Sequence, residues 1–314
     1  MKSAYFVEKN KMEVREFPKA QLVKETDAII KIVRACVCGS DLWWFRGISE
    51  RQPGPVVHEA IGLIEEVGTG VKNFKVGDFV IVPFTHGCGH CPICLAGFEA
   101  NCPNAKDGVN GGYQGEFYRA INADGALVKI PGQPSDYSDD QLASLTTLAD
   151  VMPTGFHAAK AADVHEGDTV VIFGDGAVGL CAVISAKLLG AKRIIAMSRH
   201  EERAALARDF GATDIIAERG EVAIQKIMDL TDGYGADAAL ECVGTKQAIE
   251  SAFQAVRAGG RVGRVGVPHD VNYNEWIDSL FWKNIQLGGG VASVARWDKE
   301  ILLEAVLSGE INPG

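Results

Sequence analysis

Four closely spaced cysteines form the most distinctive chemical pattern in the sequence. Their spacing is C-x2-C-x2-C-x7-C, and the residues are Cys88, Cys91, Cys94 and Cys102. Zinc prefers four tetrahedral ligands, and thiolates are soft anionic donors that suit it. Because four sulfurs leave no open coordination position, the pattern predicts a structural zinc site in a lobe at residues 86–104. Free or disulfide-bonded cysteines are the alternative, which such short gaps disfavour.

A glycine-rich segment predicts where a dinucleotide binds. Gly174, Gly176 and Gly179 give G-x-G-x-x-G after the β-branched run DTVVIF (168–173), at the start of an expected helix over 178–190. The first glycine permits a tight turn, the second lets a pyrophosphate approach the backbone, and the third lets helix and strand pack closely. The anion would lie at the helix N-terminus, beside Ala177 and Val178. A plain glycine turn is the alternative.

The end of the next expected strand, 193–197, indicates which cofactor is bound. Enzymes that use NAD place an acidic residue there to hold the ribose hydroxyls. This chain instead has Ser198 and Arg199, which can hydrogen-bond a 2′-phosphate. The sequence therefore predicts NADP as the preferred cofactor, with NAD as a possible one. The alternative is that Arg199 is a solvated turn residue.

The elements that position these residues follow two different patterns. Residues 1–152 contain short β-branched runs between Gly, Pro and Asp turns, which predict an irregular β-rich domain. Residues 153–285 alternate strand-like and helix-like segments, which predicts a doubly wound parallel sheet with helices on both faces. We expect the junction between these domains at 151–167, where a Pro, a Gly and the turn DVHEGD occur. The expected fold class is therefore α/β with a second, β-rich domain.

Three further segments resemble those of the zinc-dependent medium-chain alcohol dehydrogenases. The stretch His58-Glu59-x-x-Gly62-x5-Gly68-x2-Val71 is similar to the zinc signature of that family, and C-G-S-D at 38–41 is similar to its first-ligand motif. The segment LADVMPTG at 148–155 resembles the one that carries the third ligand, where the family has Cys or Asp. The resemblance extends over the whole chain. It implies a GroES-like catalytic domain, a Rossmann domain, and a segment at 286–314 that returns toward the catalytic domain and is incomplete.

The resemblance also implies a second, catalytic zinc held by Cys38, His58 and Asp150. A thiolate, an imidazole and a carboxylate are ligands that zinc accepts, and three protein ligands leave a fourth position for water or substrate. By the same resemblance, Asp41 orients the ligand histidine, Ser40 accepts the proton of the alcohol, and Glu59 lies near the metal. A capped turn after a strand is the alternative for Ser40 and Asp41.

Two residues depart from the family pattern. Val57 stands where the zinc signature normally has Gly, and Trp43 stands where many members have a His that completes a proton relay. Trp43 and Phe84 lie near the ligand motifs in sequence, so we expect a narrow apolar pocket for small primary or secondary alcohols, aldehydes or ketones. The residues implied to line the nicotinamide and ribose are Thr154, Val243, Gly266 and Val267.

Charge and composition limit the partners. The formal net charge of −10 at pH 7 repels nucleic-acid phosphates and anionic lipid heads, so we expect neither partner. The N-terminal residues MKSAYFVEKNKMEV contain no apolar targeting segment, so we expect a cytoplasmic protein. The resemblance implies a homodimer or homotetramer. Two enzyme alternatives are a polyol or sugar dehydrogenase and an aldehyde reductase of the same fold. A non-catalytic nucleotide-binding sensor is the alternative of another class.

Overall fold

The computed structural model describes residues 1–105, 112–269, 276–293 and 296–314, and it divides the chain into two compact units. The first unit contains Met1–Pro153 and Ser293–Gly314, and the second contains Thr154–Ala292. No helix in the described ranges is long and apolar enough to cross a membrane. The metal-ligand motifs of the sequence lie in the first unit, and the glycine motif lies in the second.

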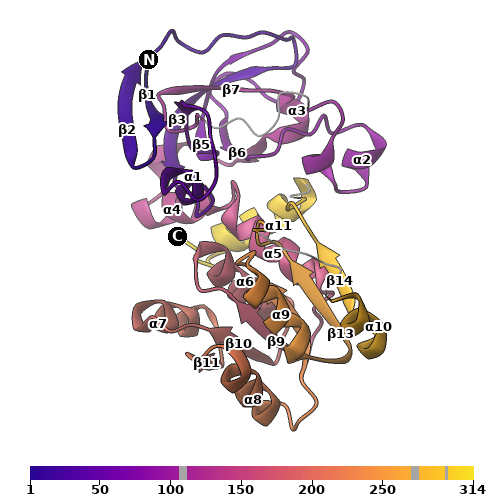
Figure 1. The fold of residues 1–314 in the computed structure, drawn as a ribbon. Coiled ribbons are helices and arrows are strands. Elements are labelled where there is room, and N and C mark those ends of the chain that lie inside the picture. Colours follow the sequence, from indigo (N-terminus) through magenta and orange to yellow (C-terminus); the bar gives the residue numbers. More distant parts are fainter. Residues whose placement is uncertain (106–111, 270–275, 294–295) are drawn as a thin grey trace. The chain divides into compact units, whose positions relative to one another are not determined.

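The first unit is built on two antiparallel sheets (Figure 1). The three-stranded sheet has the order β2-β1-β4 and the five-stranded sheet the order β7-β3-β5-β6-β8. The strands are β1 (Lys2–Glu8), β2 (Lys11–Glu16), β3 (Ala28–Cys36), β4 (Gly54–Pro55), β5 (Glu59–Val67), β6 (Phe79–Val82), β7 (Phe117–Ala120) and β8 (Val128–Ile130). Ile29 and Ile30 point to opposite faces of β3 and are both fully buried, so both faces of the larger sheet are covered.

Short helices complete this unit. They are α1 (Asp41–Phe45), α2 (Pro92–Leu95), α3 (Ala123–Ala126), α4 (Asp139–Thr147) and α11 (Arg296–Ser308), with 3-10 turns at Glu99–Asn101 and Pro134–Asp136. Helix α4 packs against β3 and β5. It starts at a capping box in which Ser138 Oγ accepts the Gln141 N–H and Gln141 Oε1 accepts the Ser138 N–H. This cap fixes the start of the helix, and the end of the helix leads directly to Asp150.

The second unit contains a six-stranded parallel sheet with the order β11-β10-β9-β12-β13-β14. The strands are β9 (Thr169–Phe173), β10 (Arg193–Met197), β11 (Asp214–Ile216), β12 (Ala236–Glu241), β13 (Val256–Arg264) and β14 (Gln286–Gly289). The chain proceeds outward from β9 to β11, then crosses back to β12 and continues to β14. The direction of winding therefore reverses between β9 and β12, which is the crevice where doubly wound folds bind nucleotides.

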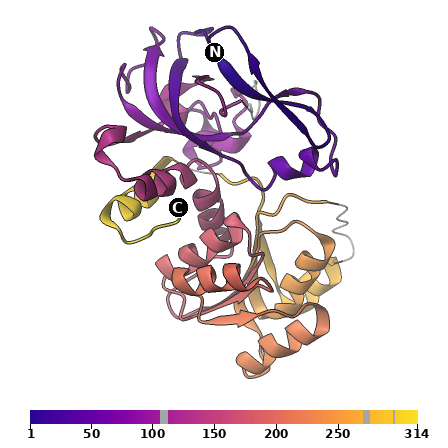
Figure 2. The same cartoon turned by 90° about the vertical axis from the view of Figure 1, so that its left-hand side faces the viewer.

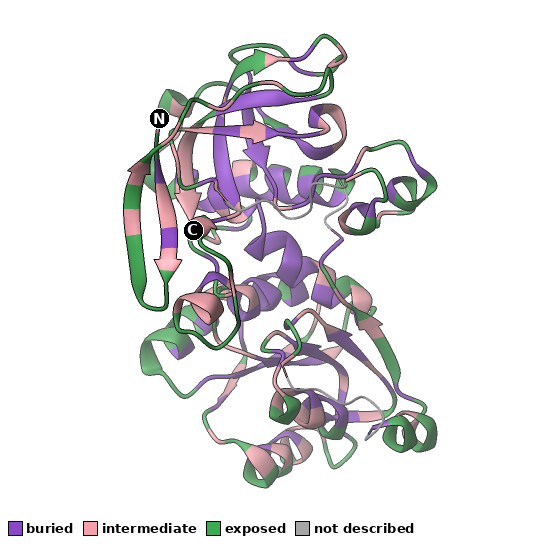
Figure 3. Cartoon of the chain, turned by 45° about the horizontal axis from the view of Figure 1, so that its top comes forward, coloured by how far each residue is buried: buried purple, intermediate pink, exposed green. Residues whose placement is uncertain are grey.

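Helices cover both faces of this parallel sheet (Figure 2). They are α5 (Val151–Ala161), α6 (Ala177–Leu188), α7 (Glu201–Phe210), α8 (Gly220–Leu230), α9 (Lys246–Ala255) and α10 (Ile277–Lys283). Val171 and Phe173 pack with α8 and α9, whereas Val170 and Ile172 pack with α5, α6 and α7. Successive residues of one strand thus serve two cores, as the continuous run TVVIF requires. The central strands are accordingly buried (Figure 3).

The structure confirms the α/β class with a doubly wound parallel sheet and a separate β-rich unit. The boundary between the two units lies between Pro153 and Thr154, within the expected junction at 151–167. This segment is helical as far as Ala161, because Pro153 lies in the first turn of α5, where no backbone N–H is needed. The C-terminal part of the first unit begins at Ser293, later than the expected 286, because residues 286–289 pair with β13 as the edge strand β14.

Candidate functional site

Four donor side chains meet at one end of the five-stranded sheet. Cys38 lies two residues after β3, His58 immediately precedes β5, Glu59 begins β5, and Asp150 lies between α4 and α5. Strands β3 and β5 are antiparallel with Cys36 opposite Glu59, so the end of one strand lies beside the start of the other. One ligand atom from each of the four side chains lies within 4.8 Å of the others. The structure therefore brings together three ligands predicted from distant segments, together with Glu59.

Asp41 and Asp150 hold the two ring nitrogens of His58. His58 Nδ1 lies 3.5 Å from Asp41 Oδ1, and His58 Nε2 lies 3.1 Å from Asp150 Oδ2. The other Asp41 oxygen accepts the Cys38 N–H at 3.0 Å. Asp41 is buried in the first turn of α1, and it therefore fixes both the backbone of one predicted ligand and the ring of another.

The cluster concentrates negative charge where water is largely excluded. Burial, and next the charge of Asp150, raise the pKa of Cys38 to about 11 and the pKa of Glu59 to about 8. Burial alone would lower the pKa of His58, but hydrogen bonds to Asp150 and Asp41 raise it well above its ordinary value. Buried anions that repel one another in this way are stabilised by a cation.

The donor set fits zinc. It offers a thiol sulfur, an imidazole nitrogen and carboxylate oxygens, which are the ligand types zinc takes in open catalytic sites. Glu59 Oε2 accepts the Cys36 thiol hydrogen at 3.0 Å, but Glu59 Oε1 is buried and has no hydrogen-bond partner within the described part of the chain. The nearest cationic group is the His58 ring, with Nε2 3.9 Å from Glu59 Oε1, which is too far for a hydrogen bond. A buried carboxylate oxygen without a hydrogen bond, beside three converging ligands, fits a metal cation as a further partner.

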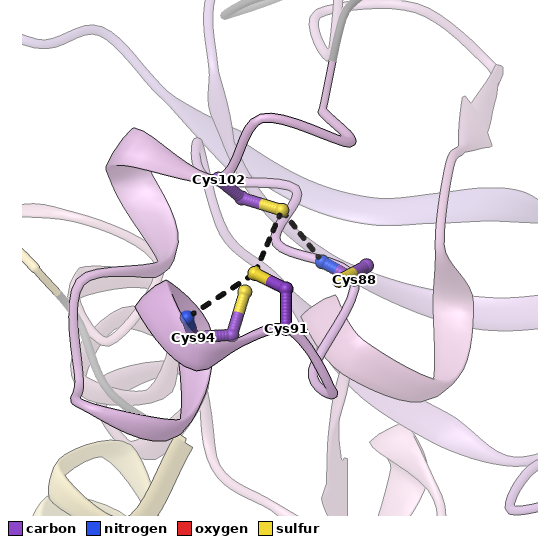
Figure 4. Close-up of side chains that lie close together, drawn as sticks. All are labelled: Cys88, Cys91, Cys94 and Cys102. Atoms are coloured by element: carbon purple, nitrogen blue, oxygen red, sulfur yellow. Dashed lines mark hydrogen bonds between the residues drawn. The ribbon is translucent and has the colours of Figure 1, made fainter.

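The four lobe cysteines form a second cluster, drawn in Figure 4. Their sulfur atoms lie within 4.8 Å of one another, and Cys91 Sγ lies 3.8 Å from Cys102 Sγ. All four are free thiols, so the disulfide alternative is not what the structure contains. Although burial raises it, the pKa of Cys88 falls to about 6, because Asn104 and backbone N–H groups donate to its sulfur. Four converging sulfurs without bridges fit a tetrahedral zinc site.

Val57, next to His58, has a strained backbone. Its φ is +72°, in the left-handed region that disfavours β-branched residues, and its side chain is buried. Sequence comparison with the family signature pointed to this position, where glycine is usual. The buried isopropyl group therefore occupies a conformation that glycine adopts without strain.

Shortening Val57 tests this strain. Val57→Ala and Val57→Gly both remove the isopropyl group, but only alanine keeps a Cβ in the left-handed region, at a cost of about 1–2 kcal/mol. We expect Val57→Gly to be more stable than Val57→Ala by about 1 kcal/mol in urea unfolding, the reverse of the usual order. An alanine variant more stable than the glycine variant would contradict the strain.

The glycine motif forms a cradle between β9 and α6. Gly174 has a φ of +121°, and a Cβ on Gly179 would lie 2.0 Å from the Gly174 carbonyl oxygen. A Cβ on Gly176 would have no heavy atom within 4 Å, so the backbone there faces open space. Gly174 and Gly179 thus allow close packing of the loop, and Gly176 leaves room for a ligand. That room lies at the start of the twelve-residue helix α6, where Ala177 and Val178 are. The residues present fit a pyrophosphate.

The loops after β12 and β13 meet beside this cradle. A Cβ on Gly174 would lie 3.1 Å from Val243 Cγ2, and a Cβ on Gly244 would lie 1.9 Å from the Val267 carbonyl oxygen. Gly266 packs equally closely on Gly244. The structure therefore brings Val243, Gly266 and Val267 to the carboxyl ends of adjacent strands, as the parallel sheet requires.

Sequence reasoning missed two acidic residues here. Glu241 ends β12, is fully buried, and accepts the N–H groups of Val243 and Gly244 at 2.8 and 2.6 Å, which fixes the loop. Asp175, inside the glycine motif, accepts the hydroxyl hydrogen of Ser198 at 2.8 Å. A charged residue that ends an apolar strand, or that interrupts a glycine motif, was the available signal. Ser198 is buried at the tip of β10, and Arg199 is exposed.

The remaining predicted residues lie in several different places. Phe84 packs edge-on to the His58 ring with centroids 6.1 Å apart, so it adjoins the first cluster. Ser40 immediately precedes α1 and Trp43 lies within it, both half-buried. Thr154 is buried in α5, in the second unit. Trp44 packs against Phe6 in the core, with ring centroids 4.6 Å apart, and this favours a structural role.

Comparison with known proteins gives matches in both units. A family profile described as an alcohol dehydrogenase GroES-like domain matches residues 24–132, and one described as a zinc-binding dehydrogenase matches residues 177–299. Zinc-type alcohol dehydrogenase B of Aspergillus flavus is 36% identical over 280 residues, which cover 85% of this chain and 64% of that protein. The chain thus spans slightly under two thirds of that relative.

Two further similarities extend over more of the chain. An NADP-dependent isopropanol dehydrogenase of Thermoanaerobacter brockii is 35% identical over 305 residues, which cover 91% of this chain and 83% of that protein. The solved structure of an alcohol dehydrogenase from Thermus sp. ATN1 superimposes with a TM-score of 0.89 at 30% identity, covering 100% of this chain and 90% of that one.

Proposed function

The chain belongs to the zinc-dependent medium-chain alcohol dehydrogenases, a family of oxidoreductases, and we propose that it transfers hydride reversibly between a small primary or secondary alcohol and NADP. The corresponding aldehyde or ketone is the substrate in the reverse direction. The observation that carries the proposal is the convergence of Cys38, His58 and Asp150 within 4.8 Å. These three ligands leave a position open for the substrate oxygen.

The catalytic roles follow from this cluster. Zinc, when bound, supplies a Lewis acid that polarises an alcohol or carbonyl oxygen. Asp41 keeps the His58 ring oriented, since it faces Nδ1 and leaves Nε2 toward the other ligands. Phe84 packs beside His58 as an apolar wall that favours small aliphatic or aromatic groups over polyols. Ser40, just before α1, accepts the proton that the alcohol releases and passes its own hydroxyl proton on toward solvent.

We assign the second zinc to the cysteine lobe at residues 86–104, with Cys88, Cys91, Cys94 and Cys102 as ligands. This gives two zinc ions per chain. In the first unit, residues 1–152 form the catalytic domain. In the second unit, the Rossmann domain binds the dinucleotide through Gly174, Gly176 and Gly179.

Metal analysis combined with a substrate panel tests the proposal. We expect two zinc ions per chain by elemental analysis, and reduction of NADP with small primary or secondary alcohols, followed by nicotinamide absorbance. Primary alcohols, secondary alcohols and polyols are assayed with each cofactor. One zinc per chain, no turnover and intact nucleotide binding would instead identify a nucleotide-binding sensor. Turnover restricted to polyols would move the substrate class to sugar alcohols.

The preference for NADP depends on the tip of β10. No acidic residue stands there, and Ser198 and Arg199 offer hydrogen bonds to a 2′-phosphate. A hydrogen bond to a charged group contributes about 1.5–3 kcal/mol, or about ten- to a hundredfold in affinity. The NADP-dependent relative from Thermoanaerobacter brockii supports the same choice.

Replacing Arg199 by aspartate tests the cofactor preference. Arg199→Asp removes one partner of the 2′-phosphate and adds a carboxylate that repels it, so we expect the KM for NADP to rise at least about tenfold while the KM for NAD falls. Lys192→Asp, which makes the same charge change at an exposed site at the opposite end of β10, serves as the control. Unchanged KM values for both cofactors in Arg199→Asp would refute the assignment.

We also propose that the enzyme acts in the cytoplasm as a homodimer or homotetramer. Phe281 and Trp282 on α10 are 70% and 78% exposed, and adjacent exposed aromatic side chains are typical of a surface that a partner covers. Light scattering measures the assembly directly. A mass equal to one chain would contradict this part of the proposal.

A further inference from the structure

We propose that Asp175 is a specificity-determining residue that weakens the binding of NADP relative to NAD. The inference rests on the proposed cofactor site and concerns a residue that the glycine motif does not require. Asp175 occupies one of the variable positions of G-x-G-x-x-G, between Gly174 and Gly176.

Both oxygens of the Asp175 carboxylate hold groups that a 2′-phosphate would need. Asp175 Oδ2 accepts the Ser198 hydroxyl hydrogen at 2.8 Å, and Asp175 Oδ1 lies 3.0 Å from Arg203 Nη1 in the first turn of α7. The Asp175 side chain is only 16% exposed, and Ser198 is buried, so this contact is shielded from water. The glycine loop thus contributes an acid to the tip of β10, although β10 itself ends without one.

The position matches the place where the two cofactors differ. An acidic residue about twenty residues after the glycine motif usually accepts the ribose hydroxyls of NAD, whereas a nearby Arg accommodates the 2′-phosphate of NADP. Ser198 lies at that point of the chain, and Asp175 reaches it across the loop. A carboxylate there can accept a ribose hydroxyl, but it repels a phosphate.

Charge then decides the direction of the effect. Burial would raise the pKa of Asp175, but hydrogen bonds from Ser198 and Arg203 hold it below its ordinary value, so the carboxylate is ionised at neutral pH. Arg203 neutralises that carboxylate in the free chain. A 2′-phosphate must therefore take Ser198 and Arg203 away from Asp175 and tolerate its charge, whereas the ribose of NAD need displace neither. Asp175 accordingly reduces the advantage that Ser198 and Arg199 give to NADP.

Removing this charge tests the inference. Asp175→Asn keeps the shape of the side chain, and we expect it to tighten NADPH binding by about ten- to a hundredfold while NADH binding stays equal or weakens. Dissociation constants come from titration of nicotinamide fluorescence. Asp209→Asn, which removes a carboxylate from an exposed site on the same helix as Arg203, should leave both constants unchanged.

A second probe isolates the adenosine half of the cofactor. Adenosine 2′,5′-bisphosphate should gain affinity in Asp175→Asn and in Asp175→Ala, whereas 5′-AMP should not. Unchanged or weaker binding of NADPH and of the bisphosphate would overturn the inference, as would an equal change for both cofactors, which indicates a structural role. If the wild-type chain binds neither NADPH nor NADH, the proposed function itself fails, and this inference fails with it.

Discussion

Replacing Asp150 with asparagine is expected to lower kcat/KM for alcohol oxidation by about a thousandfold or more, because Lewis-acid polarisation contributes several kcal/mol. The amide is neutral, so the cluster loses an anion that faces His58 Nε2 at 3.1 Å. Cys38 and His58 would then hold zinc without the charge balance that two anionic ligands provide. We expect the zinc content to fall from two ions per chain toward one, measured by elemental analysis alongside steady-state kinetics.

Asp150→Cys is the matched variant. It restores an anionic ligand, and the family resemblance implies that either Asp or Cys serves at this position. We therefore expect two zinc ions per chain and activity within about tenfold of the wild type, since a change of about 1.4 kcal/mol in the activation barrier corresponds to that factor. Full activity in Asp150→Asn would show that Asp150 is not a ligand. A cysteine variant as inactive as the asparagine variant would show that the site needs the carboxylate for something other than its charge.

The periodic segments of the second unit could be predicted closely from sequence. The expected strand at 193–197 coincides with β10 (Arg193–Met197), and the helix expected at 178–190 corresponds to α6 (Ala177–Leu188). Each strand is short, apolar and bounded by polar turns, and each helix has its own apolar face, so local pattern and global fold agree. The strand order itself, β11-β10-β9-β12-β13-β14, is not contained in these local patterns.

Side-chain contacts between distant segments could not be predicted in the same way. Asp175 and Ser198 are 23 residues apart. They come into contact because β9 and β10 are parallel neighbours, so the loop that follows β9 lies beside the end of β10. Likewise, Glu241 ends β12, and its bonds to Val243 and Gly244 depend on the backbone turn that follows. The strain at Val57 was visible in sequence only as a departure from a family signature, because a φ angle is set by the contacts on both sides.

The cysteine lobe illustrates why the sequence indicates a metal site in this segment and not a hydrophobic core. Its buried cluster consists of Cys91, Cys94 and Cys102, with Cys88 and Ala105 packed against it. The larger apolar side chains of the lobe, Ile93, Leu95 and Phe98, are instead 41%, 66% and 52% exposed. A segment that buries sulfur and exposes its aliphatic and aromatic groups gains little stability from the hydrophobic effect. We therefore expect the order of this lobe to depend on a metal ion bound by the four sulfurs.

Removing one sulfur should therefore unfold the lobe locally. In zinc-finger peptides the metal contributes about 10–16 kcal/mol to folding, so we expect Cys94→Ala to lose one zinc ion and to lower amide-exchange protection at residues 86–104 by at least about a hundredfold. Cys181→Ala, which removes a buried sulfur from α6, should keep both zinc ions and cost only about 1 kcal/mol. If Cys94→Ala retained both ions and full protection, the four sulfurs would not be holding the lobe. The cluster of Cys38, His58 and Asp150 lies at the ends of β3 and β5 and just after α4, outside the lobe. We therefore expect Cys94→Ala to keep the zinc of that cluster and the oxidation of alcohols. This one variant would then distinguish a structural zinc from a catalytic one.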